Sequence, residues 1–291
     1  MTVAVVIASL GRPDLLSTLI ERMESQSVRP DILLFSTVST DDLPEGFAET
    51  DWIKSIQGPK GLTRQRNAAL EYLGERYDVI VFYDDDFVPS LFGVENVRRF
   101  FGSHPDVAGA TGLVLADGIN GPGIDAAEAL GIVAAHDAQA APGDAIKADL
   151  VGLYGCNMAY RTSAIAGARF DERLRLYGWQ EDIDFAMQLR QRGRIVRTDA
   201  FAGVHRGVKH GRTPGLRLGY SQVINPLYLA AKGTMPLAFA FRLLARNVIA
   251  NHVRMLCPEP WVDRKGRARG NWTALFDVAR GRLTPERIEQ L

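Results

Sequence analysis

Short apolar runs alternate with helical patterns through most of the chain. The β-branched run at 2–8 predicts a buried strand, and Pro13 or Asp14 begins a segment whose apolar residues recur at helical spacing. Because a continuous apolar run suits a strand buried on both faces, the kind found in a mostly parallel sheet, we expect an α/β fold with flanking helices. The expected strands are 2–8, 31–36, 52–56, 79–83, 107–115 and 194–198, and the expected helices are 14–23, 62–73, 94–101, 161–168 and 181–192.

The pattern changes after residue 215. Pro236 opens an apolar segment that Arg242, Arg246 and Arg254 interrupt, which predicts an amphipathic helix with a basic side. The basic segment 263–270 is expected to be a loop. We therefore divide the chain into a main domain at 1–215 and a C-terminal helical extension at 216–291. The extension either docks on the main domain or attaches to an anionic membrane surface.

Composition narrows the class of protein. The chain has 291 residues, 46% of them hydrophobic, and its 34 basic and 34 acidic residues give no net charge that would steer it to nucleic acid. Cys156 and Cys257 lie far apart, without metal-type spacing, so a reduced, cytoplasmic compartment is expected. The first residues lack the basic start of a signal peptide, and no apolar run reaches the length of a transmembrane helix.

Three aspartates follow directly on the apolar run 79–83. Asp84, Asp85 and Asp86 would lie at the C-terminal end of a buried strand, where α/β sheets bind ligands. Adjacent carboxylates repel one another, and a hard divalent cation such as Mg²⁺ or Mn²⁺, held together with substrate phosphates, would relieve that repulsion. The interpretation is a metal–phosphate site, and the alternative is a solvated acidic turn.

Further segments carry charged residues that fit such a site. The glycine-containing loop at 58–61 runs into a helix, where Arg64 and Arg66 could bind phosphate or belong to a basic surface helix. Residues 117–149 have weak periodicity and are expected to form loops and short helices over one side of the site, as a lid or as a plain spacer. His205 is either a metal ligand or a surface residue.

Five blocks, in order, resemble family 2 glycosyltransferases of the GT-A fold. They are residues 5–12 followed by Pro13, 61–67 ending in Gln65-Arg66-Asn67, 84–86 as an Asp-X-Asp motif, 155–161, and 178–184 with Glu181-Asp182, after which His205 follows at a familiar distance. The similarity covers about 1–211 and leaves the extension out. One position departs from the pattern, because Ser36 stands where an aspartate is usual, and Asp41 is a substitute partner for the nucleobase or ribose.

The resemblance implies a metal-dependent transfer of a sugar from a nucleotide-diphosphate sugar to an acceptor hydroxyl, with inversion. It implies Asp182 as the base, Glu181 as its support or as an acceptor-binding residue, and a site for Mn²⁺ or Mg²⁺. The implied metal ligands are Asp86, Asp84 and His205; the implied donor-binding residues are Ala8, Ser9, Arg12, Asp41, Arg64, Arg66, Asp84 and Asp85; and the implied acceptor-binding residues are Asn157 and Trp179.

Several roles keep alternatives open. Asp84 faces either the ribose or the water shell of the metal, and Trp179 either stacks on a sugar or is buried in the core. The expected acceptor is a saccharide or lipid-linked saccharide of cell-surface polysaccharide biosynthesis, met in the cytoplasm or in peripheral contact with the inner membrane. The competing functions are a sugar-phosphate nucleotidyltransferase and a non-catalytic component of a polysaccharide assembly complex.

Overall fold

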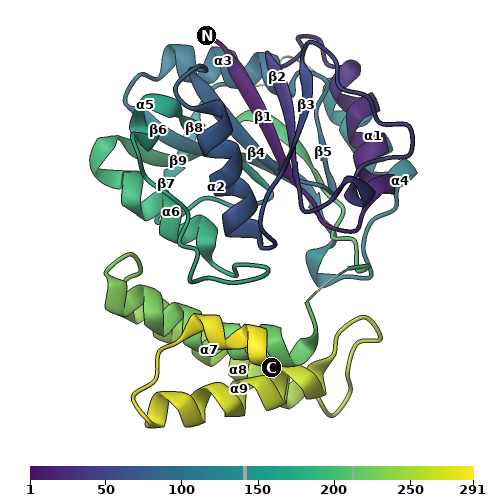
Figure 1. Cartoon of the computed structure of the whole chain (residues 1–291). Helices are drawn as coiled ribbons and strands as arrows, with labels where there is room; N and C mark the ends of the chain where they lie inside the picture. Colours follow the sequence, from purple (N-terminus) through teal and green to yellow (C-terminus); the bar gives the residue numbers. More distant parts are fainter. Residues whose placement is uncertain (140–142, 212) are drawn as a thin grey trace.

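A computed structural model describes residues 1–139, 143–211 and 213–291. Within them a nine-stranded sheet has the order β3-β2-β1-β4-β8-β6-β9-β5, with β7 also paired to β9 (Figure 1). The strands are β1 (Val3–Ala8), β2 (Ile32–Thr37), β3 (Ile53–Gln57), β4 (Val79–Asp84), β5 (Phe87–Pro89), β6 (Val107–Asp117), β7 (Ile146–Asp149), β8 (Asn157–Arg161) and β9 (Arg194–His205). β5, β7 and β8 run opposite to the other six, so the predicted mostly parallel sheet is confirmed.

Helices cover both faces of this sheet. Residues of β1 alternate between two apolar clusters, with Val3 and Val5 in one and Ala4 and Val6 in the other, as the period of a strand requires. α1 (Pro13–Glu24), α3 (Gly93–Ser103) and α4 (Ala126–Asp137) cover the first face, and α2 (Leu62–Leu73), α5 (Thr162–Ile165) and α6 (Glu181–Leu189) cover the second. Short 3-10 turns are η1 (Thr40–Asp42), η2 (Gly118–Asn120), η3 (Arg190–Arg192) and η4 (Pro285–Gln290).

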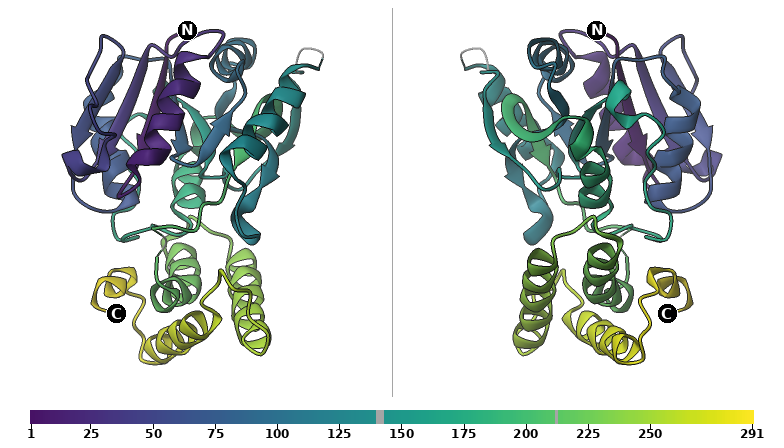
Figure 2. Two further views of the ribbon diagram at one scale, coloured as in Figure 1. Left: turned by 90° about the vertical axis from the view of Figure 1, so that its right-hand side faces the viewer. Right: turned by 90° about the vertical axis from the view of Figure 1, so that its left-hand side faces the viewer.

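The extension forms a helical layer next to the edge where β1 ends (Figure 1), and the side views of Figure 2 show this layer beyond the sheet. It consists of α7 (Gly215–Lys232), α8 (Leu237–Arg254), α9 (Arg264–Ala279) and η4. Tyr220, Ile224 and Ala274 belong to a small core of its own. No helix among the described residues combines the length and the apolar content needed to cross a bilayer.

α7 holds the extension against the main domain. The Lys232 ammonium contacts carboxylate oxygens of Asp171 at 2.7 Å and of Asp184 at 2.8 Å, and the Tyr228 hydroxyl donates to Asp171. Asp184 is fully buried at this contact. These bonds show that the extension packs on the main domain, whereas the division into two domains at residue 215 stays a prediction.

Several elements differ from the predicted ones. Segment 263–270 is not a loop, because Arg264 begins α9, whose first turn Asp263 caps by accepting from the Gly266 amide. β9 continues beyond 198 to His205, and β5 and β7 were not expected as strands. Residues 117–149 contain the short helices η2 and α4, as predicted, together with β7; residues 140–142 lie outside the described residues.

Candidate functional site

Four parallel strands end at one edge of the sheet and place most of the predicted site there. β1 ends at Ala8, β4 at Asp84, β6 at Asp117 and β9 at His205. Ala8 pairs with Asp84, and Asp117 pairs with His205, so these ends are in register. β8, which is antiparallel, begins at the same edge. The C-terminal edge of parallel strands is the usual ligand-binding edge of such folds.

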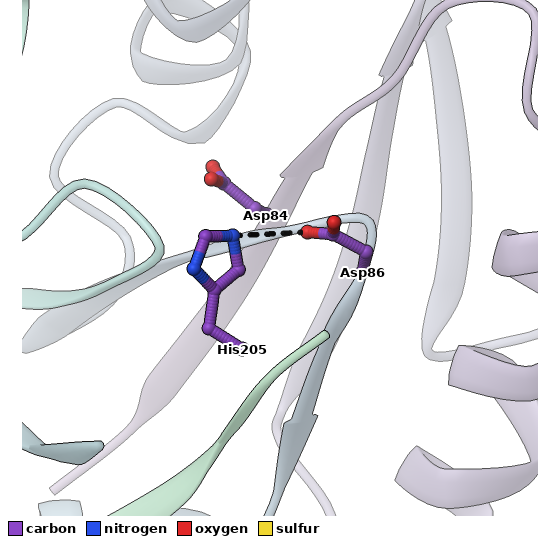
Figure 3. Close-up of side chains that lie close together, drawn as sticks. All are labelled: Asp84, Asp86 and His205. Atoms are coloured by element: carbon purple, nitrogen blue, oxygen red, sulfur yellow. Dashed lines mark ion pairs between the residues drawn. The ribbon is translucent and has the colours of Figure 1, made fainter. Parts of the chain in front are cut away.

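Asp84, Asp86 and His205 meet at this edge. One ligand atom from each lies within 4.8 Å of the others, and Figure 3 shows the three side chains converging. The Asp86 Oδ1 atom is 3.4 Å from the His205 Nε2 atom. Asp86 and His205 are buried, whereas the exposed fraction of the Asp84 side chain is 27%. The surface alternative for His205 is therefore excluded.

Asp117 orients His205, although no motif of the sequence indicated this residue. The His205 Nδ1 atom lies 2.8 Å from the Asp117 Oδ1 atom, and the Tyr154 hydroxyl donates to the Asp117 Oδ2 atom. Burial lowers the pKa of His205, but the hydrogen bonds to Asp117 and Asp86 outweigh burial and raise it to about 10. A carboxylate on the far ring nitrogen is the arrangement that fixes a metal-binding histidine. The signal available in the sequence was a carboxylate ending an apolar strand.

The Asp85 carboxylate is bound by side chains of the protein itself. It accepts from the Ser9 hydroxyl at 2.7 Å and pairs with the Arg12 guanidinium at 2.9 Å. Burial raises the pKa of Asp85 to about 6, although Arg12 opposes the shift. The Arg12 guanidinium thus neutralises the middle aspartate, and Asp84 and Asp86 are the two that reach His205.

Arg66 lies beneath the site rather than on its surface. It is buried, its Nη1 atom is 2.5 Å from the Glu181 Oε1 atom, and its Nη2 atom is 3.2 Å from the Asp84 Oδ1 atom. The same Nη2 group donates to the Gly155 carbonyl oxygen, and the guanidinium stacks on Phe82. Arg66 therefore connects the predicted metal site to the predicted catalytic acids.

Asp182 and Glu181 begin α6, after Gln180 in a left-handed conformation. The Asp182 carboxylate accepts from the Gly155 amide at 3.0 Å and from the Ile183 amide at 2.8 Å, while part of the side chain stays accessible. Burial raises the pKa of Asp182 in spite of these two bonds. Burial also raises the pKa of Glu181, to about 8, against the opposing charge of Arg66. Both carboxylates are thereby stronger bases than free ones.

The remaining predicted residues lie in different surroundings. Asp41 is exposed in η1, whereas its neighbour Asp42 is buried and accepts from the Gly11 amide. Arg64 lies 3.6 Å from Glu172 and is partly exposed. Asn157 is fully buried, and no partner for its side-chain amide occurs among the residues that the structure describes. Trp179 is half-buried, and its carbonyl accepts from Asn225 of α7.

The donor set fits a divalent cation. Two carboxylates and one imidazole combine oxygen and nitrogen ligands, which suit Mn²⁺ and related ions. Burial opposes ionisation of Asp86, but hydrogen bonds from His205 and the Val208 amide lower its pKa, so the ligand stays ionised. Asp84, Asp86 and His205 could therefore bind a metal.

No protein-family model and no curated protein matches the sequence. Solved structures resemble the chain in three dimensions. The structure of S. aureus TarS 1–349 in complex with UDP-GlcNAc has a TM-score of 0.54 at 15% identity and covers 100% of this chain and 84% of that chain. The mannosyltransferase PcManGT from Pyrobaculum calidifontis, in complex with GDP-Man and Mn²⁺, has a TM-score of 0.53 at 13% identity and covers 99% and 78%. At such identities the likeness shows a shared fold, the GT-A type of α/β fold.

Proposed function

We propose that this protein is an inverting, metal-dependent glycosyltransferase of family 2 that moves a sugar from a nucleotide-diphosphate sugar to an acceptor hydroxyl. The observation that carries the proposal is the convergence of Asp84, Asp86 and His205 at the C-terminal edge of the sheet. The fold neighbours support a sugar nucleotide as the ligand, since one holds UDP-GlcNAc and another holds GDP-Man with Mn²⁺.

The donor side of the site is built from the strand ends. When bound, a divalent cation supplies Lewis-acid neutralisation of the charge on the departing nucleoside diphosphate. Asp86 and His205 would hold it, and Asp84, the most exposed of the three, would face the cation or the ribose. Arg12 and Ser9 hold Asp85 in place. Arg66 fixes the position of Asp84 from below, which differs from the direct diphosphate contact expected from the sequence.

Asp182 is the general base in this proposal. Two backbone amides hold its carboxylate, its pKa is raised by burial, and it remains accessible to an acceptor hydroxyl. The hydroxyl transfers its proton to Asp182 as it attacks the sugar carbon, and the bond to the diphosphate breaks on the opposite side. A single displacement inverts the sugar carbon and requires no enzyme nucleophile. Glu181, buried against Arg66, positions the helix start rather than touching the acceptor.

Two residues are candidates for the acceptor side. We propose a saccharide or lipid-linked saccharide of cell-surface polysaccharide biosynthesis as the acceptor, used in the cytoplasm. Trp179 lies half-buried directly before the acids of α6, which would suit stacking on a sugar ring. Asn157 lies at the start of β8, next to the site, and its side-chain amide, which has no partner among the described residues, would bind the acceptor.

A nucleotide-binding screen tests the proposal. UDP-sugars and GDP-sugars are added with Mn²⁺ or with EDTA, and thermal unfolding is followed. A donor at 100 times its Kd should stabilise the protein by about 2.7 kcal/mol, and only when the metal is present. Asp86→Ala should lose this stabilisation. Asp51 is an exposed acid far in sequence from Asp86 and His205, and Asp51→Ala should keep the stabilisation.

Two results would contradict the proposal. Stabilisation by a nucleoside triphosphate with a sugar phosphate, with pyrophosphate release, would indicate a nucleotidyltransferase. Equal stabilisation with Mn²⁺ and with EDTA would remove the metal from donor binding.

A further inference from the structure

The helical extension exposes a group of large apolar side chains. Eight such residues belong to it, and their exposed fractions range from 38% to 86%. They are Leu237, Phe241, Ile249, Val253, Leu256, Trp261, Trp272 and Phe276. Large exposed apolar side chains gathered in one region often mark an interaction surface.

On α8 the exposed residues form two neighbouring rows. The apolar row has residues four or eight positions apart, so its members follow one another along the helix surface. It consists of Leu237, Phe241, Ile249 and Val253, and the row beside it carries Arg242, Arg246 and Arg254. The opposite side of α8 is buried at Ala240, Leu243 and Asn251. α8 therefore presents an apolar stripe with cations along it.

α9 repeats this arrangement. Lys265 and Arg269 are exposed one turn apart, and Trp272 and Phe276 follow them on the same side, with their rings 6.3 Å apart. A groove of about 390 Å³ joins the exposed sides of α8 and α9. It is lined by His252, Met255, Lys265, Ala268, Arg269 and Trp272. Two cations and an indole at one groove are suited to an anionic headgroup.

The charge of this region differs from that of the whole chain. Residues 237–282 contain nine Lys and Arg and three Asp and Glu, a formal charge of +6, although the chain as a whole is neutral. The three acids are engaged inside the extension. Glu259 pairs with Arg254 and Arg264, Asp263 caps α9, and Asp277 accepts from the Tyr220 hydroxyl. The outward charge beside the apolar rows is therefore positive.

We propose that the exposed sides of α8 and α9 are a docking surface for a bilayer that contains anionic phospholipids, with a lipid phosphate at the groove. The apolar rows would enter the boundary between headgroups and acyl chains, and the flanking cations would meet the phosphates. A second copy of the chain would bring two +6 regions together, so charge complementarity favours the anionic bilayer. A nucleic acid would leave the apolar rows uncovered.

This surface has a fixed relation to the main domain. α7 is bound to Asp171 and Asp184 and, through Asn225, to the carbonyl of Trp179. When α8 and α9 lie on a bilayer, Trp179 and the start of α6 would therefore be held at a fixed distance from the lipid. The inference does not rest on the proposed activity, because vesicle binding is measured without any substrate.

Vesicle flotation of the full chain tests the proposal. The vesicles contain phosphatidylcholine alone, or phosphatidylcholine with about 30% phosphatidylglycerol, a composition with a negative surface potential. The protein should float with the anionic vesicles at low salt, weakly with the neutral ones, and less as salt rises. Arg242→Glu with Arg246→Glu should weaken binding at least about 25-fold, since each juxtamembrane cation is worth about a fivefold factor. Arg190→Glu with Arg197→Glu, two exposed cations on the main domain, is the matched control and should bind as the wild type does.

The apolar part is tested separately. Ile249→Asn should weaken binding about tenfold or more, because a buried aliphatic side chain is lost, whereas Leu130→Asn on exposed α4 should not change it. Both positions are exposed, so the fold should be kept, and circular dichroism melting checks this.

Each contrary result would overturn the proposal. These results are a folded wild type that binds neither vesicle, equal binding to both vesicles, or a dimer in solution whose formation Ile249→Asn abolishes while vesicles stay unbound. Inorganic phosphate, added alone at millimolar concentration, separates a free anion site from a bilayer. If phosphate quenches Trp272 fluorescence and vesicles do not bind, the groove takes free phosphate and the membrane surface is wrong.

Discussion

The sheet edge and the helical extension use charge in opposite ways. At the edge, carboxylates gather around the Arg66 and Arg12 guanidinium groups. Asp84, Asp86 and His205 lie close together there and could bind a cation. In the extension, the acids of 237–282 are bound by neighbouring arginines, by the start of α9 or by a tyrosine, and other cations remain exposed beside apolar residues. An arrangement of buried acids favours proton transfer and cation binding, whereas exposed cations favour contact with an anionic surface.

Two arginine–glutamate pairs show the physical cause of the difference. Arg66 and Glu181 are both buried, and desolvation raises the pKa of Glu181 to about 8 although the arginine lies 2.5 Å away. Arg254 and Glu259 lie on the surface of the extension, and the hydrogen bonds from Arg264 lower the pKa of Glu259 to about 2. Both glutamates lie beside arginine, so the degree of burial decides whether the pKa of the glutamate is raised or lowered.

The largest expected effect comes from breaking the buried pair. Arg66→Met removes the shared partner of the buried Glu181 and of Asp84, and breaking such a buried pair costs about 3 to 5 kcal/mol of unfolding free energy. Arg254→Met, at the exposed pair, should cost about 1 kcal/mol or less. Urea unfolding of both variants measures the two values. Similar losses for the two variants would contradict the comparison.

Asp182→Asn should reduce release of nucleoside diphosphate from a bound donor by about 100-fold, because the base is lost while the single amide oxygen of Asn can keep one of the two backbone contacts. Donor affinity should change little, which isothermal titration can show. The charge-reversal variant Arg242→Glu with Arg246→Glu serves as the counterpart in the extension and should keep turnover on a water-soluble acceptor. Unchanged turnover of Asp182→Asn would remove this residue from the role of base.

The close crossing of α7 and α9 can be tested with a single methyl group. A Cβ atom at Gly219 would lie 2.1 Å from the Arg267 carbonyl oxygen, so Gly219→Ala should destabilise the protein by about 1 to 3 kcal/mol. At Gly131 on α4 the space is open, and Gly131→Ala should stabilise by roughly 0.5 to 1 kcal/mol through helix propensity. Tryptophan fluorescence during urea unfolding follows both. Equal responses would mean that the two helices do not pack this closely.

The smallest expected effect is a difference in pH dependence. The folded pKa of Glu259 lies below its ordinary value of 4.5, so its stabilising contribution is present above about pH 4.5 and is lost as the pH falls toward about 2. The folded pKa of Glu181 lies above 4.5, so stability is highest below about pH 4.5 and declines as the pH rises toward about 8. Unfolding free energies of Glu259→Gln and Glu181→Gln, each subtracted from the wild type across this range, should change in opposite directions.

Local patterns were enough to place much of the fold. The helix at 62–73 has the predicted bounds, and β4 begins with its apolar run and ends one residue after it, at Asp84. Segment 263–270 was predicted to be a loop because its glycines and basic residues suit one. Gly270 is in fact required where α9 crosses α7, since a Cβ atom there would lie 2.1 Å from the Leu216 carbonyl oxygen.

The sequence by itself determined most of the strands, most of the helices over the sheet and the run of acids that marks the site, because these depend on residue order and on the period of each element. Only the tertiary structure decided which residues meet. Asp117 at the end of β6 contacts His205 at the end of the neighbouring strand β9, and Arg66 is buried against Glu181. These contacts depend on strand register and burial, which join residues far apart in the chain. The same reason applies to the extension, where packing against α7 selects which sides of α8 and α9 remain exposed.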